Sequence, residues 1–462
     1  MMYFFTFILF FSSLVFGTTL FYLSIDSDLN YLLYIFTVFT IVYCAIMRLI
    51  EHLAALSKAE ENKAEEAEKF TVIIPAYLPA EKDLIIDTIK YLLNLNFPVD
   101  IILAYNTPEY LNVEKKLKKL PITVVRVPNS KSKAENINYI LPKIKTKYTA
   151  IFDADHQPLS ENFSKALYKL KNGYDIVQGT CLPAIDSPLS KFLSVEFNQM
   201  YNVNHIARPR IWEFAIFGGS NGYFKTETLR KISFDSRMLT EDIDLSIRAL
   251  LSNYKICFDR SIISYEKAPT NIKELWKQRT RWSQGWLQVS WKYAGQLLFG
   301  DKHQLNLKQK LGMFLLLPFR EVGQFISWQT LPLAMAISID KNSWGWLNGW
   351  FWLSLFLLGM LLIEPFWVFK VRDQKSASIK WFCLYALISP FYMLFLKTIN
   401  LYAYFRQIMG NRKFEVTNKS LGTLSQVPNL GERQTLWLKN KRSERYASLS
   451  NRQTTSVKRQ LN

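Results

Sequence analysis

Cysteine and histidine are both scarce, at four residues each in 462. Cys44, Cys181, Cys257 and Cys383 show no C-x-x-C spacing, and two of them lie in strongly apolar stretches. That pattern argues against a zinc site and a disulfide framework and suits a reducing cytoplasm. Four histidines leave little room for a histidine-based metal site, so we interpret His156 as a polar neighbour of the carboxylates beside it.

Acidic residues are also outnumbered, with 38 Asp and Glu against 57 Lys and Arg, a formal net charge of +19. Such a charge can indicate nucleic acid, but much of it lies beside apolar segments and in the C-terminal region, which fits an anionic membrane face better. The 49% hydrophobic and 15% aromatic content is rich for a purely soluble protein. We expect membrane lipids as partners and no nucleic acid.

Two apolar runs, Met1–Leu23 and Tyr31–Met47, predict two transmembrane helices within residues 1–50, since about 20 residues span a bilayer. A cleaved signal peptide is the competing interpretation of the first run, but no basic residue precedes it. Basic residues begin at Arg48 after the second run, so the positive-inside rule predicts a cytoplasmic domain on the plasma (inner) membrane. Residues 51–69 are predicted to form a charged helical linker.

Short apolar runs alternate with helical stretches from residue 70 onward. TVIIPAY, VDIILAY and TAIFDAD are typical of strands. Their alternation with helices predicts an α/β domain with a mainly parallel sheet over residues 70–285. Because ligands bind at the carboxyl ends of such strands, the residues that carry the chemistry should follow these runs.

Residues 286–410 are predicted to form interfacial and transmembrane helices. A tryptophan series suits an amphipathic helix in the membrane interface: Trp276, Trp282, Trp286 and Trp291.

Three apolar blocks follow the tryptophan series. Blocks 311–339 and 346–369 predict one crossing out and one back, the early part of the first lying along the membrane. Block 379–404 is expected to be interfacial or re-entrant, because Ser389-Pro390 interrupts it. Residues 421–462 form a basic tail that we expect to be disordered.

Two acidic motifs stand out in the α/β domain. Asp153 and Asp155, in FDAD, follow a predicted strand and can hold a hard divalent cation, Mg²⁺ or Mn²⁺, that neutralises a diphosphate. A solvated turn is the alternative. Glu241 and Asp242, in TED, precede a helix; Asp242 can accept the proton of an attacking hydroxyl, or the pair can simply stabilise the helix N-terminus.

A third motif, QRTRW, contains Gln278, Arg279, Arg281 and Trp282. Two arginines beside a tryptophan can bind a diphosphate or stack on a sugar ring. The alternative is a basic interfacial helix anchored by its tryptophan.

With these motifs in this order, the chain resembles membrane-integrated family-2 glycosyltransferases of GT-A fold, such as cellulose, hyaluronan, chitin and poly-N-acetylglucosamine synthases. The resemblance implies an α/β GT-A catalytic domain with flanking transmembrane and interfacial helices. It also implies metal binding by Asp153 and Asp155, and Asp242 as the general base. Donor diphosphate contacts would come from Gln278 and Arg281, and Trp282 would contact the acceptor. Arg279, the other arginine of QRTRW, is a further diphosphate candidate from its charge.

Further segments add to the resemblance. PAYLPAE resembles a nucleotide-contacting segment, SKAEN resembles GKAxALN, and FGGSNG lies where the family has its acceptor-proximal loop. FEVTNK, within a predicted gating loop at residues 411–420, resembles the FxVTxK loop of bacterial cellulose synthases, although a short strand before a tail would also explain it. These segments add donor-site candidates Ala76, Tyr77, Glu81, Lys133, Thr417 and Lys419, and acceptor candidates Gly219, Ser220 and Asn221.

One departure concerns the nucleotide. The family ends its second strand with an acidic pair, whereas this chain has ILAYNTP, in which Asn106 can hydrogen-bond where a carboxylate would. Asp100 lies too early to replace that pair.

The expected reaction is inverting, metal-dependent transfer of a hexosyl group from a nucleotide-sugar, with UDP as the expected nucleotide. The acceptor is a growing β-linked polysaccharide or, alternatively, a membrane lipid such as diacylglycerol. A catalytically inactive scaffold or a transporter-like partner is a further alternative, but internal repeats and additional spans are absent from the sequence.

Overall fold

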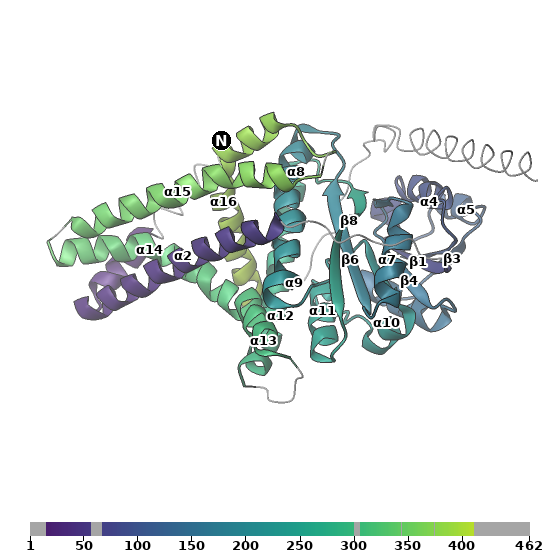
Figure 1. The fold of residues 1–462 in the computed structure, drawn as a ribbon, viewed down its shortest axis with the longest axis horizontal. Coiled ribbons are helices and arrows are strands. Elements are labelled where there is room, and N and C mark those ends of the chain that lie inside the picture. Colours follow the sequence, from purple (N-terminus) through teal and green to yellow (C-terminus); the bar gives the residue numbers. More distant parts are fainter. Residues whose placement is uncertain (1–14, 57–66, 300–304, 343, 374, 411–462) are drawn as a thin grey trace, which may run out of the picture.

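The structure is a computed structural model that describes residues 15–56, 67–299, 305–342, 344–373 and 375–410. Four predicted segments lie outside these residues: most of the first apolar run, most of the linker, the predicted gating loop with Thr417 and Lys419, and the basic tail. Figure 1 shows a sheet flanked by helices on one side of the molecule and a group of long helices that extends away from it.

An eight-stranded sheet forms the core, in the order β3-β2-β1-β4-β7-β6-β8-β5. Pairs β3/β2, β2/β1, β1/β4 and β6/β8 are parallel, and β7 runs antiparallel to both of its neighbours. The predicted α/β class is confirmed, with a sheet that is mixed but mostly parallel. The strands are β1 Phe70–Tyr77, β2 Val99–Asn106, β3 Thr123–Arg126, β4 Tyr148–Ile151, β5 Gln157–Pro158, β6 Ile176–Pro183, β7 Gly222–Lys225 and β8 Ile256–Glu266.

Strand β1 shows why the central strands read as continuous apolar runs. Ile73 packs into the core on one face of the sheet, and Val72 and Ile74 pack into the core on the other. Both faces of the sheet are therefore covered, which requires apolar residues at successive positions. Helices α6 Lys133–Ile140, α10 Thr226–Ile232 and α11 Glu241–Leu251 line one core, and α4 Ile85–Leu93, α5 Val113–Leu117 and α7 Glu161–Lys171 line the other.

Four segments join the sheet to the long helices. They are α8 Pro188–Gln199, a π-helical segment Met200–His205, α9 Ile206–Trp212 and α12 Ile272–Phe299. Helix α12 runs without interruption across residue 285, the predicted end of the α/β domain. The motif-bearing domain and the apolar helices thus share one continuous element. The short segments α3 Leu78–Glu81 and the 3-10 turn Leu141–Lys143 complete the α/β part.

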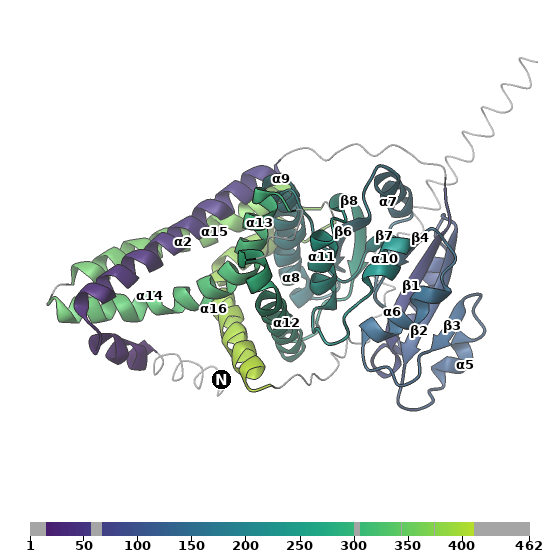
Figure 2. The same cartoon turned by 90° about the horizontal axis from the view of Figure 1, so that it is seen from below.

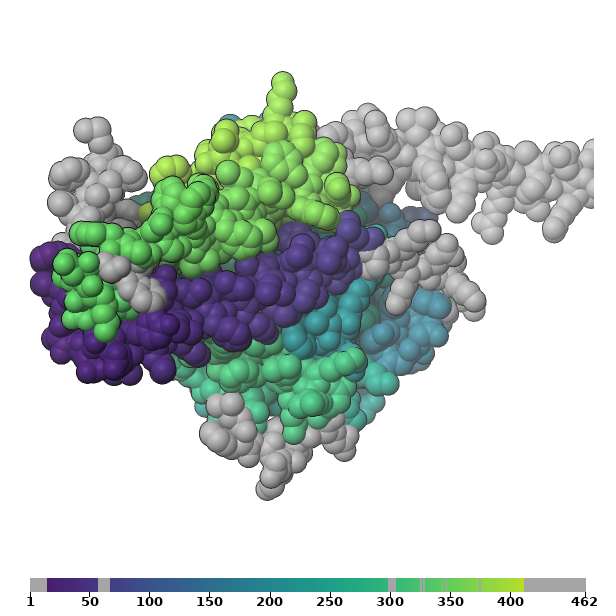
Figure 3. Space-filling model, turned by 60° about the vertical axis from the view of Figure 1, so that its left-hand side comes forward, coloured from purple at the N-terminus to yellow at the C-terminus, as the bar shows by residue number. Residues whose placement is uncertain are grey.

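Helices α2 Ser27–Ala55, α14 Arg320–Asp340 and α15 Gly345–Val371 pack together (Figure 2). A π-helical turn, Leu315–Phe319, which contains Pro318, separates α14 from α13 Leu307–Phe314. Apolar side chains of α2 and α15, such as Leu32 and Phe351, are exposed, and α2 lies along the green helices in the space-filling view (Figure 3). Such a surface suits lipid.

The two ends of this bundle differ in their contacts. Helix α14 ends beside the start of α2, where Lys341 Nζ lies 3.3 Å from Ser27 Oγ. Helix α15 returns toward the sheet, and the hydroxyl of Tyr265 on β8 donates to Asp373 just beyond its end (3.2 Å). The path therefore leads away from the sheet along α14 and back toward it along α15.

The third apolar block is one continuous helix, α16 Ile379–Ile408, so the predicted break at Ser389-Pro390 is wrong. Pro390 has no N–H for the carbonyl of Ala386, but the Ser389 hydroxyl donates to that oxygen at 2.8 Å. A neighbouring hydroxyl can keep a proline-containing helix intact in this way.

Both ends of α16 approach the motif-bearing domain. Ser376, just before it, accepts a hydrogen bond from Asn198 of α8, and Gln407 near its end accepts from Gln284 of α12. Figures 1 and 2 show α16 crosswise to α2. By length and hydropathy, the described helices able to cross a membrane are α2, residues Leu347–Val371 of α15, and α16.

We predict that Ser389→Ala destabilises the protein by about 1–2 kcal/mol, because it leaves a helix carbonyl unpaired. Thr398→Ala is the matched control, since the Thr398 hydroxyl donates within the same helix to Leu394, where no proline removes a donor. Thermal unfolding in detergent measures both. Equal loss in the two variants would contradict this explanation of the unbroken helix.

Candidate active site

The two aspartates of FDAD lie just beyond the carboxyl end of β4. The backbone N–H of Asp153 donates to Ser220 Oγ (3.0 Å), which belongs to the loop before β7. Asp155 is buried, and its carboxylate accepts the N–H of Lys267 (3.0 Å). His156 is also buried and contacts Ser264 and Glu266 on β8, at 3.0 and 2.8 Å. The turn is thus held on two sides, and His156 is a polar neighbour as predicted.

Lys133 connects the FDAD turn to the FGGSNG loop. It begins α6, where Ser132 caps the helix by accepting the N–H of Glu135. Its Nζ donates to Asp153 Oδ1 at 2.5 Å and to the backbone oxygen of Gly219 at 2.6 Å. Burial alone would lower the pKa of Lys133, but Asp153, Glu241 and Asp242 together raise it. The amine is therefore a fixed positive charge among carboxylates.

Gly219 brings the FGGSNG loop against the TED motif. Its φ is +92°, and a Cβ there would lie 2.8 Å from Asp242 Oδ2. Only glycine allows both the backbone conformation and this close approach. Residues 217–222 therefore lie between Lys133 and Asp242.

Burial raises the pKa of Asp242 to about 7, and the neighbouring Glu241 carboxylate adds to the effect. Lys133 and Arg281 oppose the rise. A carboxylate that titrates near neutrality is suited to accept a proton at physiological pH. Gln278 of QRTRW is buried, and Arg281 Nη1 donates to the oxygen of Leu239, just before TED (3.1 Å). The electrostatic effect of Arg281 on Asp242 joins the third motif to this site.

Arg279 and Asn221 do not fit their predicted roles. Arg279 is buried and donates to Glu196 on α8 (2.9 Å), so its charge is already neutralised by a carboxylate. The amide nitrogen of Asn221 donates to Thr180 and Ile262, at 3.0 and 3.1 Å. Asn221 therefore anchors the loop between β6 and β8, and we correct both assignments.

The nucleotide candidates lie at the ends of β1 and β2. Asn136 on α6 donates to the oxygen of Ala76 (3.1 Å) and to Asn106 Oδ1 (2.8 Å). Glu81 accepts the N–H of Tyr77 (2.9 Å), which fixes the turn after β1. Asn106 thus lies at the strand end, whereas Asp100 pairs with Lys69 at 2.6 Å.

Sequence reasoning missed the residues that support the FGGSNG loop. Gln178 on β6 accepts the N–H of Gly218 (2.7 Å) and donates to the oxygen of Ser220 (3.0 Å). Ser246 on α11 accepts the N–H of Phe217 (2.8 Å). The available signal was a fully buried glutamine in the otherwise largely apolar run of β6. Glu196, the partner of Arg279, gave no comparable signal.

The donor set suits a divalent cation that shares its coordination with a substrate. Asp153 and Asp155 offer carboxylate oxygens, and Mg²⁺ commonly takes one or two carboxylates together with substrate phosphates. Lys133 Nζ already lies 2.5 Å from Asp153 Oδ1, so a divalent cation would share the Asp153 carboxylate with this amine. Within the described residues no group of three or more His, Cys, Asp or Glu forms a complete protein metal site.

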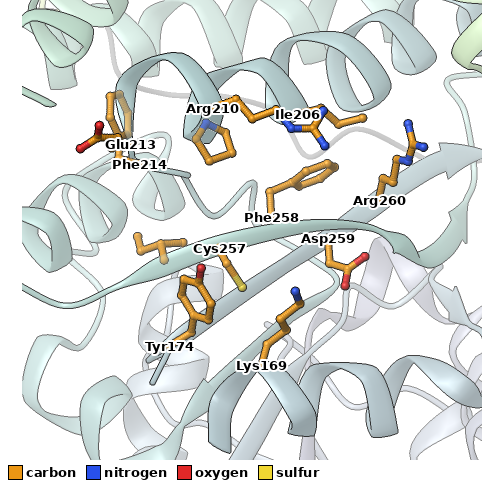
Figure 4. A pocket seen from close by; sticks show the side chains of 12 residues that line it. Lys169, Tyr174, Ile206, Arg210, Glu213, Phe214, Cys257, Phe258, Asp259 and Arg260 are labelled. Carbon is orange, nitrogen blue, oxygen red and sulfur yellow. The ribbon is translucent and has the colours of Figure 1, made fainter. Parts of the chain in front are cut away.

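A separate pocket of about 350 Å³ lies on another part of the domain. Figure 4 shows Ile206 and Arg210 of α9 on one side of Phe258 on β8, and Lys169 of α7 on the other. None of the predicted site residues that the structure describes lines this pocket. The motif residues therefore define the candidate active site.

Comparison with known proteins identifies the family. The family model for glycosyl transferase family group 2 matches residues 148–405, more than half of the chain. The chain belongs to this family. As the sequence predicted, it is a glycosyltransferase, and its catalytic domain has the GT-A fold.

Two curated relatives are similar over part of their length. The probable glycosyltransferase YdaM of Bacillus subtilis is 26% identical over 256 residues, covering 52% of this chain and 60% of the relative. The poly-beta-1,6-N-acetyl-D-glucosamine synthase of Staphylococcus epidermidis is 23% identical over 281 residues, covering 59% of this chain and 65% of the relative. The match thus spans about three fifths of each relative.

A solved mannosyltransferase from Pyrobaculum calidifontis, in complex with GDP-Man and Mn²⁺, has the same fold. Its TM-score is 0.53 at 15% sequence identity, and the match covers 88% of this chain and 99% of the mannosyltransferase. The likeness extends over the long helices as well as the sheet.

We predict that Gly219→Ala lowers sugar transfer at least about 100-fold in a folded protein, because the new methyl group displaces Asp242 and small misplacements of reacting groups are costly. Gly173→Ala is the matched control, since Gly173 has φ +95° but no atom within 4 Å of its Cβ position. Both should lose some stability. Similar activity in the two variants would contradict the contact between the loop and the base.

Proposed function

We propose that this glycosyltransferase transfers a sugar, with inversion, from a UDP-sugar to a growing β-linked polysaccharide at the membrane. The observation that carries the proposal is the convergence of three motifs and the FGGSNG loop, through Lys133 and Gly219, on one place at the carboxyl ends of the strands. The similarity to a poly-beta-1,6-N-acetyl-D-glucosamine synthase supports a polysaccharide product.

Each side chain has one task in the proposed mechanism. Asp242 accepts the proton of the acceptor hydroxyl, which attacks the anomeric carbon opposite the leaving diphosphate, so that an α-linked donor gives a β-linked product. Lys133 and Arg281 supply positive charge for the diphosphate as it departs. Gln278, Ala76, Tyr77, Glu81 and Asn106 contribute to the donor site. Glu241 reinforces the raised pKa of Asp242.

Asp153 and Asp155 would hold a divalent cation, Mg²⁺ or Mn²⁺, whose charge would neutralise the donor diphosphate. The mannosyltransferase of the same fold was solved with Mn²⁺, which supports a divalent cation without choosing between the two.

The proposed membrane arrangement is based on the packing of α2, α14 and α15. We place two spans in residues 1–50 and the catalytic domain, residues 70–285, in the cytoplasm. The chain then crosses out within residues 311–339 and back along α15, with α16 along the interface, although α16 and not α14 is among the candidate spans by length and hydropathy. The FEVTNK segment then returns to the cytoplasmic side, where Thr417 and Lys419 would close over the nucleotide. Helix α16 has an apolar length that suits a span as well, and its two ends beside α8 and α12 favour the interfacial placement.

We predict that kcat/KM declines as pH falls through about 7. Burial raises the pKa of Asp242 above its ordinary value, so the carboxylate base is present above that pKa and lost below it. A pH series between about 5.5 and 8.5 measures the titration. A profile that is flat across this range would contradict Asp242 as the base.

Asp242→Asn should reduce transfer by about 10²–10⁴-fold, the usual contribution of a general base. Glu241→Gln is the comparison, because it removes the adjacent carboxylate and keeps Asp242; its loss should be far smaller. Equal losses of transfer in the two variants would contradict the assignment of Asp242 as the general base.

Product partitioning tests the acceptor. We expect the full-length protein in lipid vesicles to convert labelled UDP-glucose or UDP-N-acetylglucosamine, with Mg²⁺ or Mn²⁺, into a large glycosidase-sensitive product insoluble in organic solvent. EDTA should abolish the labelling. Label in the organic phase would replace the polysaccharide with a glycolipid such as a glycosyl diacylglycerol, and no label in either phase would contradict the proposed function.

A further inference from the structure

Two similar clusters of side chains connect α12 to its neighbours. In the Glu196 cluster, Arg279 donates to Glu196 Oε2 at 2.9 Å, and its guanidinium lies 4.2 Å from the ring centroid of Trp282. The Tyr392 hydroxyl of α16 donates to the same oxygen, at 2.7 Å. The cluster therefore joins three elements, α8, α12 and α16, around one carboxylate.

The second cluster repeats this chemistry one turn along α12. Arg320 lies 4.3 Å from the ring centroid of Trp286 and donates to Glu321 at 2.5 Å. The Tyr404 hydroxyl of α16 donates to Glu321 as well. This Glu321 cluster has the same four residue types, but its arginine and glutamate both come from α14, and Trp286 packs against a different hydrophobic cluster from Trp282.

Trp282 occupies a different position. It follows Arg281, which contacts the segment before TED, and it packs beside Tyr201 and Tyr265 while remaining partly exposed. The backbone of α12 is fixed against that segment nearby, since a Cβ at Gly285 would lie 2.5 Å from Thr240. The backbone of α12 is thus placed relative to the TED segment.

We propose that Glu196 and Arg279 are positioning residues that hold the Trp282 ring as a stacking surface for the acceptor sugar, with Tyr392 fixing Glu196 from α16. The proposal rests on the proposed function, because it takes Trp282 as the acceptor contact. Arg279 covers part of the indole and leaves its exposed part for a sugar ring.

A gain in stability does not explain the buried ion pair between Arg279 and Glu196. Arg279 is 6% exposed, and a buried ion pair gains little over well-packed apolar residues once its desolvation is counted. The ion pair is better explained if it holds the Trp282 ring in one orientation, because stacking on a ring depends on the geometry of that ring.

The test compares Glu196→Gln and Tyr392→Phe with the matched variants Glu321→Gln and Tyr404→Phe, in full-length protein reconstituted in lipid. The donor is whichever of UDP-glucose and UDP-N-acetylglucosamine labels product, and the acceptor is the matching β-linked tetrasaccharide. Three quantities are measured: KM for the acceptor, KM for the donor, and acceptor-free hydrolysis of the donor.

We expect the Glu196-cluster variants to raise the acceptor KM about tenfold, equivalent to about 1.4 kcal/mol. Their donor KM and donor hydrolysis should stay near wild type, because Lys133, Asp153 and Asp242 are untouched. The Glu321-cluster variants should leave the acceptor KM unchanged. Tyr392→Phe removes one hydroxyl and keeps the ring, so it decides the question if Glu196→Gln does not fold.

Three results would overturn the inference. They are an unchanged acceptor KM in Tyr392→Phe, equal changes in donor and acceptor KM, and the same acceptor effect in the Glu321 cluster. A wild-type protein that transfers sugar only to lipid would also overturn it while leaving the glycosyltransferase activity intact. Failure of the wild type to transfer sugar at all would instead refute the proposed function, and the inference with it.

Discussion

The amine of Lys133 is the contact on which the active site depends. It joins Asp153, at the end of β4, to the backbone of Gly219, and its positive charge is surrounded by the carboxylates of FDAD and TED. Without it, several acidic groups would face one another in a partly buried place. Like charges so close would protonate or move apart, and the geometry that brings donor and acceptor groups together would be lost.

Helix α12 connects the residues around Lys133 to the apolar helices. Arg281 and Gln288, on one face of the helix, both hydrogen-bond to Leu239 just before TED, and Ser283, on another face, hydrogen-bonds to Asn400 of α16. The same rigid element therefore carries part of the active site and contacts the apolar helices. Helix α16 also contacts α8, so two helices link it to the domain that carries the site.

The fold class and the three motifs could be predicted from the sequence because each is local. Aspartates after an apolar run and acidic residues at a helix start can be recognised from the adjacent sequence alone. The failures have two causes. Ser389 donates to the carbonyl of Ala386 within the same helix turn, a local contact that residue types alone do not reveal. Gln178 stands out as a polar residue in a largely apolar run, but the loop that it supports lies about forty residues away and cannot be derived from that run.

The role of Arg279 could be predicted from the sequence only in part. Positions 279 and 281 are two apart on a helix, and residues so spaced do not share a face. The two arginines therefore could not both face one site, and helical geometry alone argued that one of them had another partner. Its identity, Glu196, required the packing of α8 on α12 and could not be derived from spacing.

The most direct measurement is a cryo-electron microscopy structure of the full-length protein in lipid nanodiscs with UDP and Mn²⁺. We predict the nucleotide at the carboxyl ends of β1, β2 and β4, with Asp153 and Asp155 holding Mn²⁺ near its diphosphate and with Asp242 facing the open side. Nucleotide bound in the separate pocket beside Phe258, or held without either aspartate, would contradict it.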